Sequence, residues 1–168
     1  MEISKGPLRV MLDANILIAG SGWPRWPYEI LQHALAADFK LVLCPLIIES
    51  ARHRIRQDFP DYLSRFDEFL ATCDYEEVPN PPMEQVRRNQ DIVRAPADVP
   101  IALAAINANV DYLVSEDKHF TDRDETTAKL RQRIQPLISG TFLREVMGWS
   151  SEELERVRGR NWADLGRE

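Results

Sequence analysis

Residues 9–18 read Arg-Val-Met-Leu-Asp-Ala-Asn-Ile-Leu-Ile, and this stretch decides the fold. An apolar run ends at an aspartate, a turn-prone Ala-Asn pair follows, and a second apolar run begins. The first run is short, which predicts a central strand of a parallel sheet with both faces covered. Asp13 then lies at the carboxyl end of that strand, where ligands bind in open α/β sheets. The alternative is that Asp13 or Asn15 only caps the following helix.

Composition sets the class of protein. The chain has 168 residues, 44% of them apolar, which is enough for one domain with a core. A formal net charge of −6 argues against binding nucleic acid by bulk attraction, so any such contact needs a local basic patch. The two cysteines, Cys44 and Cys73, lack the spacing of a zinc site and fit a reducing compartment. Without a signal-peptide pattern or a membrane-spanning apolar run, we expect a cytoplasmic protein with no membrane contact.

Strands and helices alternate along the rest of the chain. Apolar runs predict strands at 39–44, 75–78, 111–115 and 133–138, the second of these at a sheet edge. Helical periodicity predicts helices at 27–37, 46–58, 61–72, 101–108 and 139–146. Ser150 and Glu153 form a capping-box pattern that opens one more short helix. The alternation predicts an α/β fold with a mostly parallel sheet and helices on both faces.

Residues 19–27 are rich in glycine, proline and tryptophan. The segment contains two glycines and two prolines, so we predict a loop. Trp23 and Trp26 within it either fix the loop to the core or face a partner chain.

Acidic residues follow two of the predicted strands. Asp117 comes after the strand 111–115, as Asp13 comes after the strand at 9–12. Two central parallel strands that each deliver an aspartate bring like charges together, and a bound cation relieves that repulsion. Asp98 precedes the helix 101–108, where it either caps the helix or points into the same site.

A further acid, Glu49, lies one turn into the helix 46–58. Arg52, His53 and Arg56 follow it by three, four and seven residues, on the same helical face. This pattern fits an internal ladder of salt bridges, which contributes little to stability. It equally fits an acid at a metal ion with basic groups for phosphate beside it.

Four segments in this order resemble the PIN-domain ribonuclease family, and within it the VapC-type toxins of toxin–antitoxin pairs. They are Leu-Asp-Ala-Asn-Ile-Leu-Ile (12–18), Cys-Pro-Leu-Ile-Ile-Glu (44–49), Arg-Ala-Pro-Ala-Asp-Val-Pro (94–100) and Asp-Tyr-Leu-Val-Ser-Glu-Asp-Lys-His-Phe (111–120). The resemblance covers roughly residues 7–147. The chain departs from the family at Ala14, where threonine is frequent, at Ala95 and Ala97, where further acids are frequent, and at Glu116, where glycine is frequent.

The resemblance implies a three-layer α/β/α fold around about five mostly parallel strands. It implies a PIN-like nuclease domain over residues 1–148, followed by a C-terminal helix and tail over 149–168. It also implies a ribonuclease that uses Mg²⁺ or Mn²⁺, with catalytic acids at Asp13, Glu49, Asp98 and Asp117 and the three aspartates as metal ligands. Clustered carboxylates without histidine or cysteine suit such hard cations.

The same resemblance implies the partners. The substrate is single-stranded or structured RNA, contacted by Asn15, Ser115, Arg52 and Arg56. A cognate antitoxin and a second copy of the chain in a homodimer are the expected protein partners.

Two alternatives remain at this point. One is a catalytically silent PIN-like scaffold that binds RNA or protein. The other is a phosphotransferase similar to haloacid dehalogenases, with Asp13 as the nucleophile. That family requires a second aspartate two residues on, and Asn15 stands there. Binding of a divalent ion would distinguish the nuclease from the scaffold.

Overall fold

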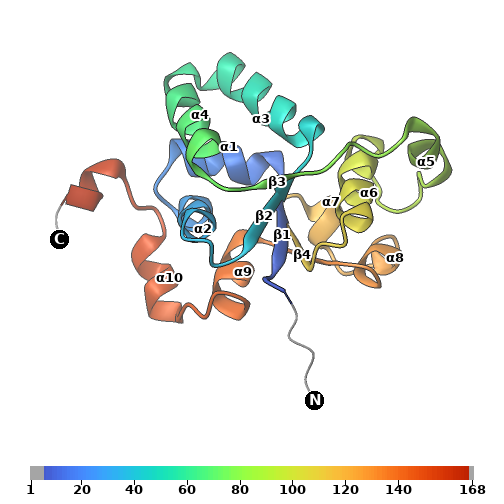
Figure 1. Cartoon of the computed structure of the whole chain (residues 1–168). Helices are drawn as coiled ribbons and strands as arrows, with labels where there is room; N and C mark the ends of the chain where they lie inside the picture. Colours follow the sequence, from blue (N-terminus) through green and yellow to red (C-terminus); the bar gives the residue numbers. More distant parts are fainter. Residues whose placement is uncertain (1–5, 167–168) are drawn as a thin grey trace.

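A five-stranded sheet lies at the centre of the molecule in the computed structural model, which describes residues 6–166 (Figure 1). The strands run in the order β3-β2-β1-β4-β5, and every neighbouring pair is parallel. Their bounds are Arg9–Leu12 for β1, Lys40–Leu43 for β2, Glu76–Glu77 for β3, Tyr112–Val114 for β4 and Gln135–Leu137 for β5. The predicted α/β fold with a central parallel sheet is confirmed.

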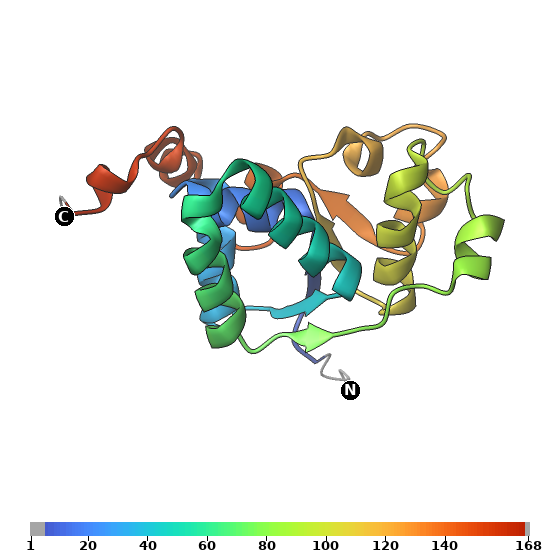
Figure 2. The same cartoon turned by 90° about the horizontal axis from the view of Figure 1, so that it is seen from above.

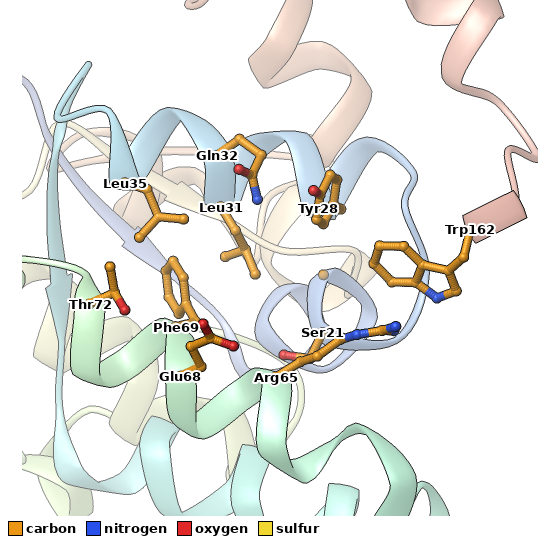
Figure 3. A pocket seen from close by; sticks show the side chains of 11 residues that line it. Ser21, Tyr28, Leu31, Gln32, Leu35, Arg65, Glu68, Phe69, Thr72 and Trp162 are labelled. Carbon is orange, nitrogen blue, oxygen red and sulfur yellow. The ribbon is translucent and has the colours of Figure 1, made fainter. Parts of the chain in front are cut away.

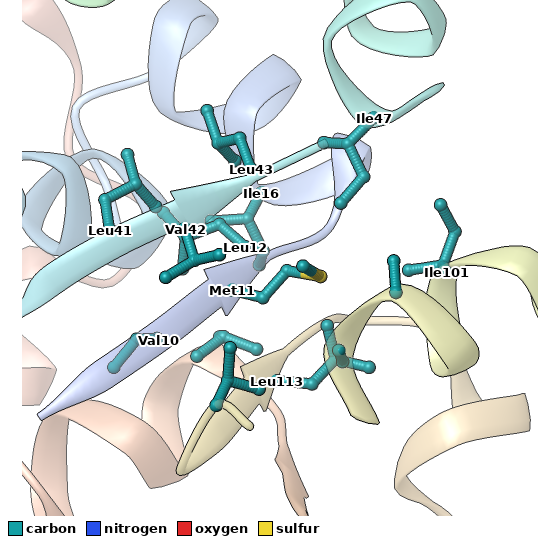
Figure 4. Close-up of a cluster of buried hydrophobic side chains, with 14 of the residues drawn as sticks. Val10, Met11, Leu12, Ile16, Leu41, Val42, Leu43, Ile47, Ile101 and Leu113 are labelled. Atoms are coloured by element: carbon teal, nitrogen blue, oxygen red, sulfur yellow. The ribbon is translucent and has the colours of Figure 1, made fainter. Parts of the chain in front are cut away.

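Strand β1 lies in the middle of the sheet and is buried on both faces. Met11 stands opposite Val42 of β2 on one side and opposite Leu113 of β4 on the other. These three side chains are fully buried, and Figure 4 shows them in the core with Ile16 and Ile101. A continuous apolar run suits this position because a central parallel strand has no face in water.

Helices cover both faces of the sheet (Figures 1 and 2). One side carries α1 (Ala14–Gly22), α2 (Trp26–Leu35), α4 (Leu63–Thr72) and α9 (Ser139–Glu145), with α3 (Pro45–Asp58) packed on α1 and α4. The other side carries α5 (Met83–Arg88), α6 (Val99–Asn107), α7 (Lys118–Thr121) and α8 (Ala128–Arg131). The chain also contains α10 (Ser151–Val157) and the 3₁₀ turns η1 (Pro60–Tyr62), η2 (Pro96–Asp98) and η3 (Trp162–Gly166). Within residues 6–166, no helix has both the length and the apolar composition needed to cross a membrane.

The predicted loop at 19–27 is shortened to residues 23–25, because α1 continues through Gly22 and α2 begins at Trp26. Glycine serves packing here instead of a turn. A Cβ on Gly20 would lie 2.5 Å from Leu31 Cδ1, so only glycine lets α1 and α2 approach this closely.

The two tryptophans of this region pack within the chain. The Trp23 ring meets Phe59 and Tyr62 edge-on, with centroids 5.3 and 5.6 Å away. The Trp26 indole N–H donates to the carbonyl oxygen of Leu154 at 2.9 Å. Both side chains are half-buried. These contacts fix the segment to the core, as one of the two alternatives predicted, and a contact of the tryptophans with a partner chain stays a prediction.

The C-terminal segment packs on the side of the sheet that carries α1, α2 and α9. Ser150 and Glu153 form the predicted capping box at the start of α10, which lies against α9. Beyond α10, the Trp162 indole donates to the carbonyl oxygen of Gly22 at 3.0 Å. Arg160 and Glu29 form an ion pair of 2.6 Å with both side chains largely buried. Residues 151–166 are thus attached to α1, α2 and α9.

Candidate functional site

Asp13 directly follows β1 and lies at the N-cap of α1. Its backbone N–H donates to the carbonyl oxygen of Val114 at 3.0 Å, which extends the pairing with β4 by one residue. The carboxylate accepts hydrogen bonds from Ala14 N and from Ser115 Oγ, each at 2.8 Å. Burial is the largest influence on Asp13 and raises its pKa; the bonds from Ser115 and Ala14 oppose this, and the charge of Asp117 adds to it. Asp13 is therefore both a helix cap and a buried acid at the sheet edge.

Asn15 and Ser115 hold the Asp13 carboxylate in place. The Asn15 amide donates to Asp13 Oδ2 at 3.3 Å and to Ser115 Oγ at 3.1 Å. The Ser115 hydroxyl also accepts from the backbone N–H of Asp117 at 3.0 Å, and its side chain is fully buried. Ser115 therefore orients Asp13 from inside the fold, and its predicted contact with a substrate stays a prediction.

Asp98 points into the site and does not cap its helix. It ends η2 at the start of α6, and its side chain makes no capping hydrogen bond. Instead, Asp98 Oδ2 lies 3.1 Å from Nδ1 of His119. The pKa of Asp98 is raised to about 6, first by burial and then by its hydrogen bond and charge repulsion with Asp117; the His119 contact lowers it, and Asp13 raises it further.

Asp117 and His119 complete a cluster of three titratable side chains. Asp117 is the N-cap of α7, and its Oδ1 accepts from the backbone N–H of His119 at 2.9 Å. The His119 ring nitrogen Nδ1 lies 3.1 Å from the same oxygen and 3.1 Å from Asp98. The expectation of a carboxylate site without histidine is therefore wrong. In the sequence, His119 stands only two residues after Asp117. This spacing brings the imidazole to the carboxylates because a helical turn begins directly after β4.

A cleft of about 480 Å³ opens beside Asp13 and Asp98. Its walls come from α1, α3, η2 and α6, and the other lining residues are Ala14, Asn15, Ile18, Leu46, Ile47, Ser50, Arg54, Ala97 and Ile101. Because the pKa of Asp98 responds to both Asp117 and Asp13, the three aspartates share one electrostatic environment. The parallel pairing of β1 with β4 places Asp13 and Asp117 at the same edge of the sheet, and Asp98 lies at the start of α6.

Glu49 stands apart from these acids. It is exposed on α3, and the residues of α3 that line the cleft are Leu46, Ile47, Ser50 and Arg54. Neighbouring positions in a helix of about 3.6 residues per turn point roughly 100° apart, so Ser50 faces the cleft while Glu49 is directed to its side. Among the residues that the structure describes, the potential metal ligands that cluster are Asp98, Asp117 and His119, without Glu49.

The arginine of α3 that lines the cleft is Arg54, whereas the sequence suggested Arg52 and Arg56. Arg52 forms an ion pair with Asp67 of α4 and lies over the Phe66 ring, 5.2 Å from its centroid. Arg52 thus connects α3 to α4, and its predicted contact with the substrate stays a prediction. Arg56 is exposed outside the cleft lining, whereas Arg54 lines the cleft.

Glu116 does not add to the acidic cluster. Its carboxylate accepts a hydrogen bond from the backbone N–H of Ser139 at 2.9 Å, at the start of α9. Glu116 thus binds the start of α9 and is not among the clustered ligand atoms of Asp98, Asp117 and His119.

A second hollow lies away from the acids, between α1, α2 and α4 (Figure 3). It has a volume of about 340 Å³, with Leu31, Leu35 and Phe69 on its walls and Trp162 at one end. Arg65 crosses the Trp162 ring 3.9 Å from its centroid. Since this groove holds none of the clustered aspartates, the cleft beside Asp13 is the candidate active site.

The donor atoms at the site fit a divalent cation. Asp98, Asp117 and His119 each offer a ligand atom, and these atoms all lie within 4.8 Å of one another. Carboxylate oxygens are ligands of Mg²⁺ and Mn²⁺, and a cation would neutralise the repulsion that raises the pKa of Asp98. The residues present therefore suit the ion that the sequence resemblance implies.

Comparison with known proteins bears on the fold. No protein-family model and no curated protein matches the sequence. The crystal structure of PAE2754 from Pyrobaculum aerophilum is similar with a TM-score of 0.58 and 16% identity, over 84% of this chain and 91% of that one. VapBC2 from Rickettsia felis, solved bound to a DNA fragment from their promoter, is similar with a TM-score of 0.56 and 15% identity, over 78% of this chain and 98% of that one. The chain therefore shares its fold with these two structures, and the PIN-like α/β fold that the sequence predicted is confirmed.

Proposed function

We propose that this protein is a divalent-metal-dependent ribonuclease that hydrolyses RNA phosphodiester bonds. The observation that carries the proposal is the meeting of three aspartates, from the ends of β1 and β4 and the start of α6. Two of them, Asp13 and Asp98, line one open cleft, and the charge of Asp117 acts on both. Burial and the charge of Asp117 raise the pKa of both Asp98 and Asp13, and acids perturbed in this way are costly to keep together unless they serve a site. The PIN-like fold is consistent with this chemistry.

Each residue has a separate part in the proposed reaction. Asp13 is preorganised, because Ala14, Asn15 and Ser115 all donate to its carboxylate. Asp98, Asp117 and His119 offer the ligand atoms for Mg²⁺ or Mn²⁺, with Asp13 adjacent. An ion held there would supply positive charge near the phosphate and would help to activate water. Arg54 lines the cleft and takes the part that the sequence suggested for Arg52, a contact with the RNA backbone.

The proposal extends to a biological role. We propose that the chain is the toxin of a toxin–antitoxin pair, acts in the cytoplasm, forms a homodimer and binds a cognate antitoxin. The similarity of its fold to VapBC2 supports this role. We expect a neighbouring reading frame to encode a small antitoxin. That protein should copurify with the chain and suppress its activity.

RNA cleavage in the presence and absence of metal tests the proposed activity. Wild type with Mn²⁺ should cut an unstructured RNA, EDTA should stop cleavage, and added Mn²⁺ should restore it. Asp13→Asn and Asp98→Asn should each lower the rate at least ~100-fold, because each removes a charge required around the ion. Glu116→Gln is the matched control, since Glu116 lies outside the cluster and glutamine keeps the oxygen that accepts from Ser139.

The outcomes also separate the alternatives. Cleavage that persists in EDTA, or wild-type rates in Asp13→Asn, would overturn the metal-nuclease proposal. RNA binding without cutting across a broad panel of sequences would favour the silent scaffold. The phosphotransferase alternative is disfavoured, because Asn15 stands where that family requires a second acid.

A further inference from the structure

His119 lies against two carboxylates, with one ring nitrogen close to both. Its Nδ1 is 3.1 Å from Asp98 Oδ2 and 3.1 Å from Asp117 Oδ1. The ring is 45% exposed, so an ion can reach it from solvent. The three side chains come from the start of α6 and the first turn of α7, and their ligand atoms lie within 4.8 Å of one another.

These separations agree with the edge of a coordination octahedron. Adjacent ligand atoms on an octahedral ion with bonds of about 2.1 Å are about 3.0 Å apart. The two nitrogen–oxygen distances are therefore what neighbouring ligands of one ion require, with little movement of either side chain. The same distances also suit hydrogen bonds from a protonated Nδ1 to the carboxylates, so the experiment must distinguish a ligand from a hydrogen-bond donor.

The chemistry of the donors points to a particular class of ion. Mg²⁺ prefers oxygen ligands, whereas imidazole nitrogen binds first-row transition metals more strongly. Mn²⁺ accepts carboxylate ligands and follows the first-row series in its affinity for nitrogen. A set of two carboxylates and one imidazole should therefore favour Mn²⁺ over Mg²⁺ more than a set of carboxylates alone.

We propose that His119 is a metal ligand of this site, bound through Nδ1, and that it makes the site selective for Mn²⁺ over Mg²⁺. The inference deepens the proposed function by naming the ion and a ligand outside the predicted acids. It rests on that function only in taking Asp98 and Asp117 as metal ligands.

The test measures metal binding without RNA. Mn²⁺ bound to the wild-type protein is examined by electron spin-echo envelope modulation, which detects a ¹⁴N nucleus coordinated directly to the ion. Affinities for Mn²⁺ and Mg²⁺ are measured by titration calorimetry. The variants are His119→Gln, which keeps an N–H donor for the carboxylates but loses the imidazole nitrogen, and His53→Gln, an exposed histidine of α3 outside the cleft lining. Circular dichroism checks their folding, and His119→Asn replaces His119→Gln if the latter does not fold.

Wild type and His53→Gln should show ¹⁴N modulation, and His119→Gln should lose it. His119→Gln should weaken Mn²⁺ binding at least ~10-fold and Mg²⁺ binding less than ~3-fold. Bound Mn²⁺ without ¹⁴N modulation in wild type, or equal losses for both ions in His119→Gln, would overturn the inference and leave His119 as a donor to the carboxylates. RNA cleavage separates the two proposals: cleavage without ¹⁴N coupling contradicts this inference alone, and ¹⁴N coupling without cleavage contradicts only the nuclease.

Discussion

At the scale of single residues, two acids define the site. Both carboxylate oxygens of Asp13 accept hydrogen bonds, and the pKa of Asp98 is raised. Asp13 is 9% exposed and receives hydrogen bonds from three neighbours, so its carboxylate has one orientation. Asp98 has a raised pKa because it is partly buried close to Asp117. Rigid placement of one acid beside another that resists ionisation suits a site that is completed by a cation.

The raised pKa of Asp98 predicts a specific pH dependence of stability in EDTA. The folded state holds the proton more tightly than the unfolded state, so the carboxyl becomes unfavourable for folding as pH rises from about 4 through about 6. Asp98→Asn should therefore stabilise the metal-free protein above pH 7 by about 1–2 kcal/mol, after allowance for screening by water. The gain should shrink towards zero near pH 4. Urea denaturation at several pH values measures it, and a gain that is independent of pH would contradict the cause given.

The orientation of α3 predicts unequal effects of its polar residues. Ser50 and Arg54 line the cleft, while Glu49 does not, so Arg54→Gln should slow RNA cleavage more than Arg52→Gln. Glu49→Gln should retain roughly a third or more of the wild-type rate, compared with the ~100-fold loss expected for Asp98→Asn. Initial rates on one RNA with Mn²⁺ compare the variants. A loss in Glu49→Gln as large as that in Asp98→Asn would restore Glu49 to the catalytic group.

At the scale of elements, close helix packing decides where glycine is required. The Gly-containing segment after Ile18 is helical because α1 needs small residues where it meets α2 and η1. At Gly22, a Cβ would lie 3.0 Å from the Tyr62 ring. A residue type that usually indicates a turn thus shapes a helix interface in this chain.

Gly20→Ala should lower the free energy of unfolding although alanine is the better helix former. The new Cβ would overlap Leu31, which is buried and has little room to move. Overpacking of a core costs about 1–3 kcal/mol, which exceeds the gain of at most about 1 kcal/mol in helix propensity. Gly6→Ala is the control, because nothing lies within 4 Å of a Cβ there. Thermal unfolding of both variants measures the change in stability. A Gly20→Ala protein more stable than wild type would show that helix propensity outweighs the steric overlap.

At the scale of the whole molecule, the C-terminal segment joins distant parts of the chain. Arg160 pairs with Glu29 of α2 and also donates to the carbonyl oxygen of Pro24 at 2.7 Å. Trp162 packs edge-on against Tyr28 with centroids 5.3 Å apart. Through these contacts, residues 160–162 pack against α2 and against the connection between α1 and α2.

A double-mutant cycle tests the energy of this attachment. The Arg160 and Glu29 side chains are 17% and 19% exposed, so their pairing is less screened than that of surface ions. Glu29→Gln and Arg160→Gln should each destabilise the protein by about 1–3 kcal/mol. The double variant should lose less than the sum, with a coupling of about 1 kcal/mol or more. The i,i+4 pair Glu84–Arg88, which is mostly exposed, is the control and should show coupling of about 0.5 kcal/mol or less. Additive effects at Glu29 and Arg160 would show that the pair contributes no net attachment.

Local sequence determined the strands, most helices and the positions of three aspartates, because these depend on short-range patterns. The run before Asp13 is apolar enough to require a central strand, and Ser150 caps its helix with groups only three residues away. Tertiary structure alone decided which side chains face the cleft. The rotation of α3 against α1 and α4 turns Arg54 towards the site and Arg52 away, and the packing of α6 beside α7 brings His119 to Asp98, 21 residues earlier in the chain. Spacing along the sequence specifies neighbours within one element, but contacts between elements depend on how the whole core packs.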